Sequence, residues 1–282
     1  MAELRGNTRT RTHASARESF GLYRQLVGAQ VRSHLEYRVS FAIDAFSSLA
    51  INFVDFVTVL VLFSHIPALG GWSLWQVAFL YGFSGISFAI ADLFIGHIED
   101  LHLQIRSGQF DVVLLRPVGS FLQVMAFDLS LRRLGKLSQA AIVFGFALAH
   151  LHVPWTPTRV AVLLASIPSG AVIYGSIWVL GACLTFFTVG SGEASNAFTY
   201  GGNTFASYPL DIFGPWLRRM LAFVVPLGFV AYLPGAFILD KHDALHLPSF
   251  LHYCAPLVAI AAATVAGAVW RFSVRHYRSS GS

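Results

Sequence analysis

The residues with the clearest chemical potential are two carboxylates in the first long apolar run, Asp44 and Asp55. Eleven residues separate them, so a helix that turns 100° per residue places them about 20° apart around its axis. Ionisable side chains are costly inside a bilayer and mark functional positions there. Ser48, Asn52 and Thr58 lie within about 80° of the same line. We expect this polar face either to line a substrate path or to be buried against another helix or subunit.

A second unusual stretch lies near the C-terminus, where an apolar run contains two prolines. Pro226 and Pro234 are each followed within two residues by a glycine, and Tyr232 stands between them. Proline removes a helical hydrogen bond, so this segment is predicted to be kinked or partly re-entrant. Such a break suits a bundle that must flex, although close helix packing alone could also produce it.

The histidines do not form a convincing metal motif. His97, Glu99 and His102 resemble H-E-x-x-H, but their spacing does not place both histidines on one helix face, so a structural role is favoured. His242 and His246 have the i, i+4 spacing that can hold zinc if a third ligand arrives. Histidine also tolerates a membrane interface simply because it can be neutral or charged. We expect no metal site.

The motifs for catalysis are missing from the sequence. No G-x-x-x-x-G-K-[ST] occurs, so the chain cannot bind ATP by that route. The segment Gly82-Phe83-Ser84-Gly85 imitates the nucleophile turn of a protease. A serine protease would need a histidine at the same depth, and none of the 11 histidines falls in the middle of a predicted span. We expect a non-catalytic chain without a cofactor of its own.

The composition places these residues in a membrane. Of the 282 residues 55% are hydrophobic and 12% are charged, whereas a soluble domain is about 25% charged. A membrane-spanning helix needs about 20 apolar residues. We therefore predict an all-α polytopic membrane protein with one permease domain, residues 39–272, and six transmembrane helices. The predicted spans are residues 39–63, 72–95, 137–151, 160–189, 217–239 and 251–272.

The flanking regions are polar. Residues 1–16 are basic and predicted to be disordered, and residues 273–282 form a basic tail. Residues 17–38 have apolar side chains at helical spacing with arginines between them, which is typical of an N-terminal amphipathic interfacial helix. The apolar positions are Phe20, Tyr23, Val27, Val31 and Leu35.

A polar hinge, residues 96–120, separates the second and third predicted spans. Helical spacing at its start is broken at Ser107-Gly108 and stops at Arg116-Pro117. Of the 19 lysines and arginines, all but Arg159 and Lys241 are predicted to lie on the side of the hinge and both termini, and Arg218 and Arg219 are among them. Basic residues mark the cytoplasmic side. The charge of +5 therefore reflects orientation, and we expect no nucleic-acid partner.

The hinge motif Ile105-Arg-Ser-Gly108-Gln-Phe-Asp111-x-x-Leu114-Leu115-Arg116-Pro117 resembles the cytoplasmic loop of ABC-2-type transporter permeases. Leu35-Glu-Tyr37-Arg38, Tyr208-Pro209-Leu-Asp-Ile-Phe and Pro226-x-x-Phe229-x-x-Tyr232-x-Pro234 are similar to a six-span bacterial branch of that family. The resemblance implies that the hinge forms a cytoplasmic coupling helix that docks on a separate ATPase subunit. The residues expected to couple to the ATPase are Glu99, Leu101, Ile105, Gly108, Phe110, Asp111, Leu115, Arg116 and Pro117.

The resemblance implies that the first, second and fifth spans line the subunit interface and the substrate path, so it assigns Pro226, Tyr232 and Pro234 to the same path or interface as the polar face of the first span. It also implies the setting of the protein. Two permease subunits, identical or sister chains, would pair with ABC ATPases in the bacterial plasma membrane, among membrane lipids and with both termini cytoplasmic. ATP and magnesium would bind the partner, and most such permeases export their substrates, here an amphiphilic one. Two other classes stay open at this point: an ion-coupled secondary transporter that uses Asp55, and a non-transporting membrane assembly subunit.

Overall fold

A computed structural model describes residues 38–116, 119–125, 133–188 and 192–277. The predicted disordered tail, nearly all of the predicted amphipathic helix and Pro117 lie outside these ranges. Within them the chain is helical, and its only β pairing is an isolated bridge between Leu69 and Trp72.

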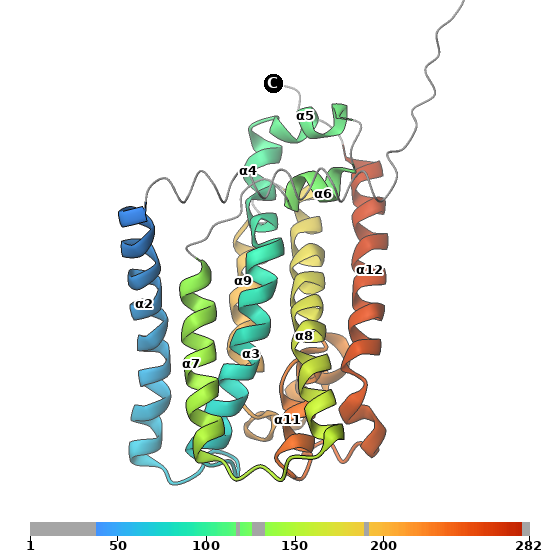
Figure 1. The fold of residues 1–282 in the computed structure, drawn as a ribbon. Coiled ribbons are helices and arrows are strands. Elements are labelled where there is room, and N and C mark those ends of the chain that lie inside the picture. The colour runs from blue at the N-terminus through green and yellow to red at the C-terminus, as the bar shows by residue number, and fades with distance from the viewer. Residues whose placement is uncertain (1–37, 117–118, 126–132, 189–191, 278–282) are drawn as a thin grey trace, which may run out of the picture.

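Five long helices lie side by side, roughly parallel, as the apolar runs predict (Figure 1). Three helical stretches in the described part of the chain are long and apolar enough to cross a membrane, or four if a bent pair counts as one span. These helices support the all-α polytopic prediction, whereas the number of six spans stays a prediction. The five helices are α2 (Arg38–His65), α3 (Leu74–Ile95), α7 (Leu134–His150), α8 (Pro157–Cys183) and α12 (Ala255–His276).

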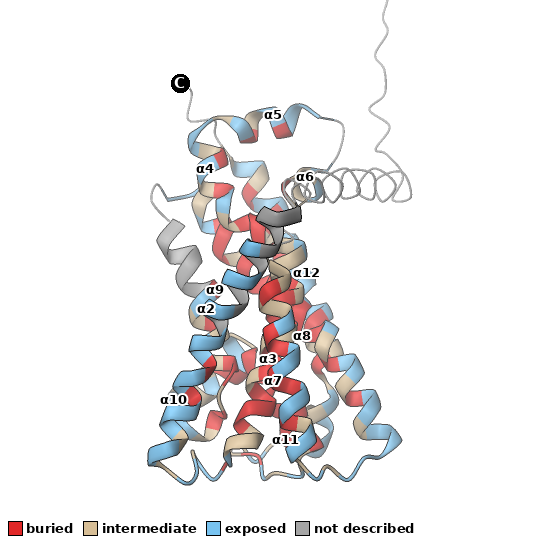
Figure 2. Cartoon of the chain, turned by 60° about the vertical axis from the view of Figure 1, so that its left-hand side comes forward, coloured by how far each residue is buried: buried red, intermediate tan, exposed pale blue. Residues whose placement is uncertain are grey.

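Helix α3 lies at the centre of the bundle and carries much of the buried surface (Figure 2). The ring of Phe88 packs edge-on against Trp178 of α8, with centroids 4.9 Å apart. Small residues allow the helices to approach closely. A Cβ on Gly82 would collide with the backbone of Phe144 in α7, so that contact requires glycine.

The polar hinge lies at one end of the bundle as a chain of short helices (Figure 1). They are η1 (Gly96–Asp100), α4 (Leu101–Arg106), α5 (Gln109–Leu115) and α6 (Ser120–Met125). The predicted break at Ser107-Gly108 is confirmed, because Gly108 adopts φ 71° between α4 and α5. This left-handed backbone favours glycine.

The segment between the fourth and fifth predicted spans, to which no helix was assigned, contains a helix, α9 (Gly192–Ala206). It packs against α8 and α3. Its composition, GEASNAFTYGGNTFA, is too polar and glycine-rich to indicate a helix at membrane depth. Packing against two apolar neighbours therefore stabilises α9, because its intrinsic helix propensity alone is too low.

Residues 217–239 do not form one crossing helix. α10 (Pro215–Arg219) continues into the π-helical turn η5 (Met220–Val224), and η6 (Leu227–Phe229) leads into α11 (Tyr232–Ile238). The two halves are bent by 75° at Pro226. Arg218 before the bend donates a hydrogen bond of 3.0 Å to the carbonyl of Ala244 after it. The segment therefore returns to the end where it began, which confirms the predicted break and corrects the predicted full span.

The same contacts correct the predicted side of Arg218 and Arg219. The guanidinium of Arg218 also donates to the carbonyls of Leu210, Asp211 and Phe213. The carboxylate of Asp211 accepts a 2.8 Å hydrogen bond from the indole of Trp72, next to the start of α3. This is the end opposite the hinge. Arg218 is held there because its guanidinium donates hydrogen bonds to four backbone carbonyls. These hydrogen bonds outweigh the general preference of basic residues for the cytoplasmic side.

Candidate functional site

The hinge helices have one face turned into the bundle. Ile98, Leu101 and Phe110 are fully buried, and Val113 is nearly so. Helical spacing places these residues on one side of their short helices. The hinge is therefore packed onto the bundle as part of its hydrophobic core.

Phe110 is the main anchor of α5. Its ring centroid lies 5.3 Å from Phe186 and 5.2 Å from Tyr277, both in edge-to-face contact. Trp270 of α12 lies 6.4 Å away and also contacts Phe121 of α6. Aromatic pairs in this geometry add to the free energy of apolar burial. α5 is thus connected to the hinge-side ends of α8 and α12, two of the apolar stretches long enough to span a membrane.

The opposite face of the hinge is exposed and partly apolar. The side chain of Leu115 is 81% exposed, and Leu103 and Val112 are each 53% exposed. Arg106 and Arg116 are exposed beside them. Exposed apolar side chains accompanied by basic residues are typical of a surface that contacts another protein or a membrane. We call Leu103, Val112, Leu115 and Arg116 the docking face.

The predicted coupling residues thus divide into three groups. Leu101 and Phe110 are buried anchors, and Leu115 and Arg116 belong to the docking face. Ile105, Asp111 and Glu99 are half-buried between them. Gly108 shapes the turn, and Pro117 lies outside the described residues.

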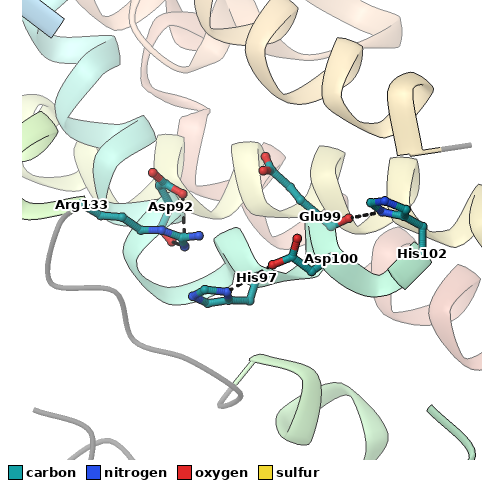
Figure 3. A network of polar contacts seen from close by, with 6 residues as sticks. All are labelled: Asp92, His97, Glu99, Asp100, His102 and Arg133. Carbon is teal, nitrogen blue, oxygen red and sulfur yellow. Dashed lines mark hydrogen bonds and ion pairs between the residues drawn. The ribbon is translucent and has the colours of Figure 1, made fainter. Parts of the chain in front are cut away.

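An ion pair ties the last turn of α3, just before the hinge, to the start of α7 (Figure 3). A guanidinium nitrogen of Arg133 lies 3.2 Å from the carboxylate of Asp92 and also donates to the Asp92 carbonyl. Gly96 makes this possible, because a Cβ there would overlap both the guanidinium and the carboxylate. The pair fixes the point where α3 passes into the hinge.

His97 and His102 have partners within the hinge, as their expected structural role requires. His97 lies 3.7 Å from Asp100, and the Nδ1 atom of His102 lies 2.8 Å from the carbonyl oxygen of Glu99 (Figure 3). Each partner is three residues away along the chain. These contacts hold the tight turn between η1 and α4.

The carboxyl group of Glu99 points toward α9 and not along the hinge. Its neighbours are Thr199, which forms a side-chain hydrogen bond with it, and Tyr200. Both belong to α9, which packs on η1. Glu99 therefore provides a polar contact between the hinge and the helix that leads into the re-entrant segment.

The polar face of α2 is described only in part. Asp44, Ser48 and Asn52 are placed on the α2 backbone, but their side chains lie outside what the structure describes. Asp55 and Thr58 are exposed, and Thr58 donates to the carbonyl of Val54. Asp55 is therefore available to a substrate or to a second subunit, the two alternatives predicted for it.

Lys136 of α7 lies in an apolar setting with acidic groups around it. Its ammonium group sits 3.5 Å from the ring centroid of Phe88, and the acidic residues in its surroundings are Asp92 first, then Asp55 and Glu99. The ring of Tyr200 lies 5.8 Å away on α9. Cation–π contacts of this kind hold a charge in an apolar setting. Lys136 thus brings side chains of α3, α7 and α9 together through Phe88 and Tyr200.

The three predicted residues of the broken span have structural contacts. Pro226 lies at the bend, and Pro234 is buried within α11. Tyr232 is buried, and its hydroxyl oxygen accepts a 3.0 Å hydrogen bond from the amide of Ala244. Tyr232 therefore fastens the return of the segment, and it does not share a surface with Asp55.

The paired histidines at the far end do not gather further ligands. The rings of His242 and His246 are 4.9 Å apart. Among the residues that the structure describes, no group of three His, Cys, Asp or Glu side chains could hold a metal ion.

Sequence reasoning missed several residues of this site. The partners of Phe110, namely Phe186 and Trp270, come from distant segments, and nothing local indicates them. Thr199 and Tyr200 directly precede Gly201 and Gly202 in a polar, glycine-rich segment, which gives no local signal of a site. Arg133 and Lys136 precede the third predicted span, and their spacing indicates no site either.

Comparison with known families identifies one match. A family model described as an ABC-2 family transporter protein matches residues 49–281. The match includes most of α2, the whole hinge, α9, the re-entrant segment and α12. Comparison with curated proteins and with solved structures gives no match.

Proposed function

The chain belongs to the ABC-2 family of transporter proteins and is a permease component of an ABC transporter, and we propose that it exports an amphiphilic substrate with energy from a separate ATPase subunit. Family membership implies an ABC ATPase partner. ATP and magnesium would be bound by that partner, and this chain would have no catalytic residue and no cofactor.

One observation supports the coupling role most directly: the hinge has a docking face outside and an anchored face inside. Leu115 and Arg116 offer an apolar contact and a charge to a partner. Phe110, one helical turn away on α5, is fully buried against the aromatic cluster. A push on the docking face would therefore move residues that are packed in the bundle.

Two routes would carry this motion into the membrane. The first passes from Phe110 to Trp270 and hence to α12. The second passes from Glu99 to Thr199 of α9 and then to the re-entrant segment. Because packed elements shift between discrete arrangements, closure of the ATPase would re-orient α9 and α12 together.

The substrate path or subunit interface is proposed at α2. Its exposed apolar side chains include Phe46, Ile51 and Val54, and Asp55 interrupts them. A second permease subunit, identical or a sister chain, would cover part of this face. The hinge and both termini would be cytoplasmic in a bacterial plasma membrane, because the hinge side keeps the excess of basic residues even without Arg218 and Arg219.

The test is co-isolation of the full chain with its ATPase from native membranes, followed by measurement of ATP hydrolysis. Leu115→Asp places a charge in the docking face and is expected to abolish co-isolation. Trp155→Asp is the control, because Trp155 is 46% exposed at the opposite end of the bundle. The proposal fails if both variants retain the ATPase equally, or if no nucleotide-hydrolysing subunit accompanies the unaltered chain.

A further inference from the structure

A cavity of about 590 Å³ lies between α8, α12 and the re-entrant segment. One wall is the hinge-side half of α8, including Ile177 and Gly181, and another is the stretch of α12 from Val258 to Val265. The third wall is the bend itself, Ala222 to Phe229. The cavity exists because residues with little or no side chain line it: Gly181, Ala222, Ala261 and Ala262.

The cavity offers almost no hydrogen-bonding group. Its one polar side chain, Ser176, donates its hydroxyl to the carbonyl of Val172. At the bend the amides of Val225, Leu227 and Phe229 all have carbonyl acceptors, and Pro226 has no amide hydrogen. A ligand with polar groups would lose its hydrogen bonds with water here and gain few in return, which costs free energy. The cavity therefore suits hydrocarbon.

The mouth of the cavity faces the surroundings of the bundle. Val224 is 75% exposed, Phe223 57% and Val265 53%. The two helices that form the walls, α8 and α12, are among the described helices long and apolar enough to span a membrane. The opening therefore faces the hydrocarbon region of the bilayer, where aliphatic chains are the surrounding solvent.

We propose that this cavity is a binding site for one aliphatic chain of a bilayer phospholipid, inserted sideways between α8 and α12 and against the bend at Pro226. A dry apolar cavity of this kind takes apolar ligands, and its volume lies within the range of small-molecule sites, about 300–1,000 Å³. The acyl chain of the lipid fills the space beneath the π-helical turn and supports the re-entrant segment. The site is distinct from the polar residues Asp55 and Lys136, and it does not depend on the ATPase.

The test is photolabelling of the full chain in vesicles of phosphatidylethanolamine and phosphatidylglycerol that contain a trace of phospholipid with a diazirine in one acyl chain. Residue-resolved mass spectrometry is expected to find labels concentrated on Ile177, Leu180 and Val258. In Ala262→Phe the added ring occupies the cavity, so labelling of these residues falls several-fold. Ala268→Phe is the matched control, since Ala268 is exposed on the same helix and does not line the cavity.

Unchanged labelling of the cavity residues in Ala262→Phe would overturn the proposal, as would labelling of the unaltered chain that is no denser in the cavity than around Ala268. If Ala262→Phe does not fold, as judged by gel filtration, Ala262→Leu provides the same comparison with a smaller side chain. Loss of ATPase co-isolation would leave this result unaffected, so the two proposals can fail separately.

Discussion

Gly96 shows how a single residue determines the geometry at the base of the hinge. The space that a side chain would take is filled by the guanidinium of Arg133 and the carboxylate of Asp92. Both side chains are about one-fifth exposed. An ion pair shielded in this way loses more when it is disrupted than one on an open surface.

Gly96→Ala is expected to lower the free energy of unfolding by up to about 1 kcal/mol, because the methyl group separates the pair while the flexible ends of Arg133 and Asp92 can move aside. Gly145→Ala in α7 is the control, because an added Cβ there meets no atom within 4 Å. Denaturant unfolding in detergent measures the difference. Equal stabilities of the two variants would show that the ion pair adjusts without cost.

At the scale of elements, α5 has two roles that can be separated by substitution. Phe110 is fully buried, whereas Leu115, five residues later, is 81% exposed. The two residues therefore test anchoring and docking within one helix.

Phe110→Ala is expected to cost about 3–5 kcal/mol of folding free energy, because it opens a cavity among Phe186, Trp270 and Tyr277. Leu115→Ala should change stability by less than about 0.5 kcal/mol yet weaken association with the ATPase. Unfolding curves and co-isolation of both variants provide the measurement. A stability loss in Leu115→Ala as large as that in Phe110→Ala would contradict the division.

Some of these elements could be predicted from the sequence and others could not. The long helices and the break at Gly108 follow from apolar runs and from local turn chemistry, so they could be predicted. The return of residues 217–239 could not, although Pro226 indicated a bend, because its direction depends on Arg218 reaching Ala244 across 26 residues. α9 was missed because its stability comes from packing on α3 and α8 and not from its own composition.

The same limit applies to the candidate site. The hinge was recognisable because a polar interruption between apolar runs is a local pattern. The inward direction of Phe110 and Glu99 depends on Trp270 and Thr199, which are distant in the sequence. The polar face around Asp55 was recognisable from helical spacing alone, whereas the contact of Lys136 with Phe88 and Tyr200 arises only through the tertiary fold.

At the scale of the whole molecule, the revised position of Arg218 changes which loops share a side of the membrane. The loop before α3, the start of α10 and the loop after α11 meet through Trp72, Asp211 and Ala244. Trp216 in α10 is 75% exposed. It should therefore lie on the same side as Trp155, opposite Leu115.

Single cysteines test this topology after replacement of the native Cys183 and Cys254. A membrane-impermeant thiol reagent applied to intact cells should label Trp216→Cys and Trp155→Cys alike. Leu115→Cys should react only after the membrane is opened. Labelling of Trp216→Cys together with Leu115→Cys would restore the side first predicted for Arg218 and contradict the re-entrant path.

The central claim is that the docking face of the hinge receives the ATPase. The most direct measurement places a photo-crosslinking amino acid at Leu115 in one variant and at Phe250, 59% exposed at the opposite end, in another. The account predicts that a nucleotide-hydrolysing subunit is crosslinked from position 115 and not from position 250. Crosslinking of that subunit from position 250 alone would contradict it.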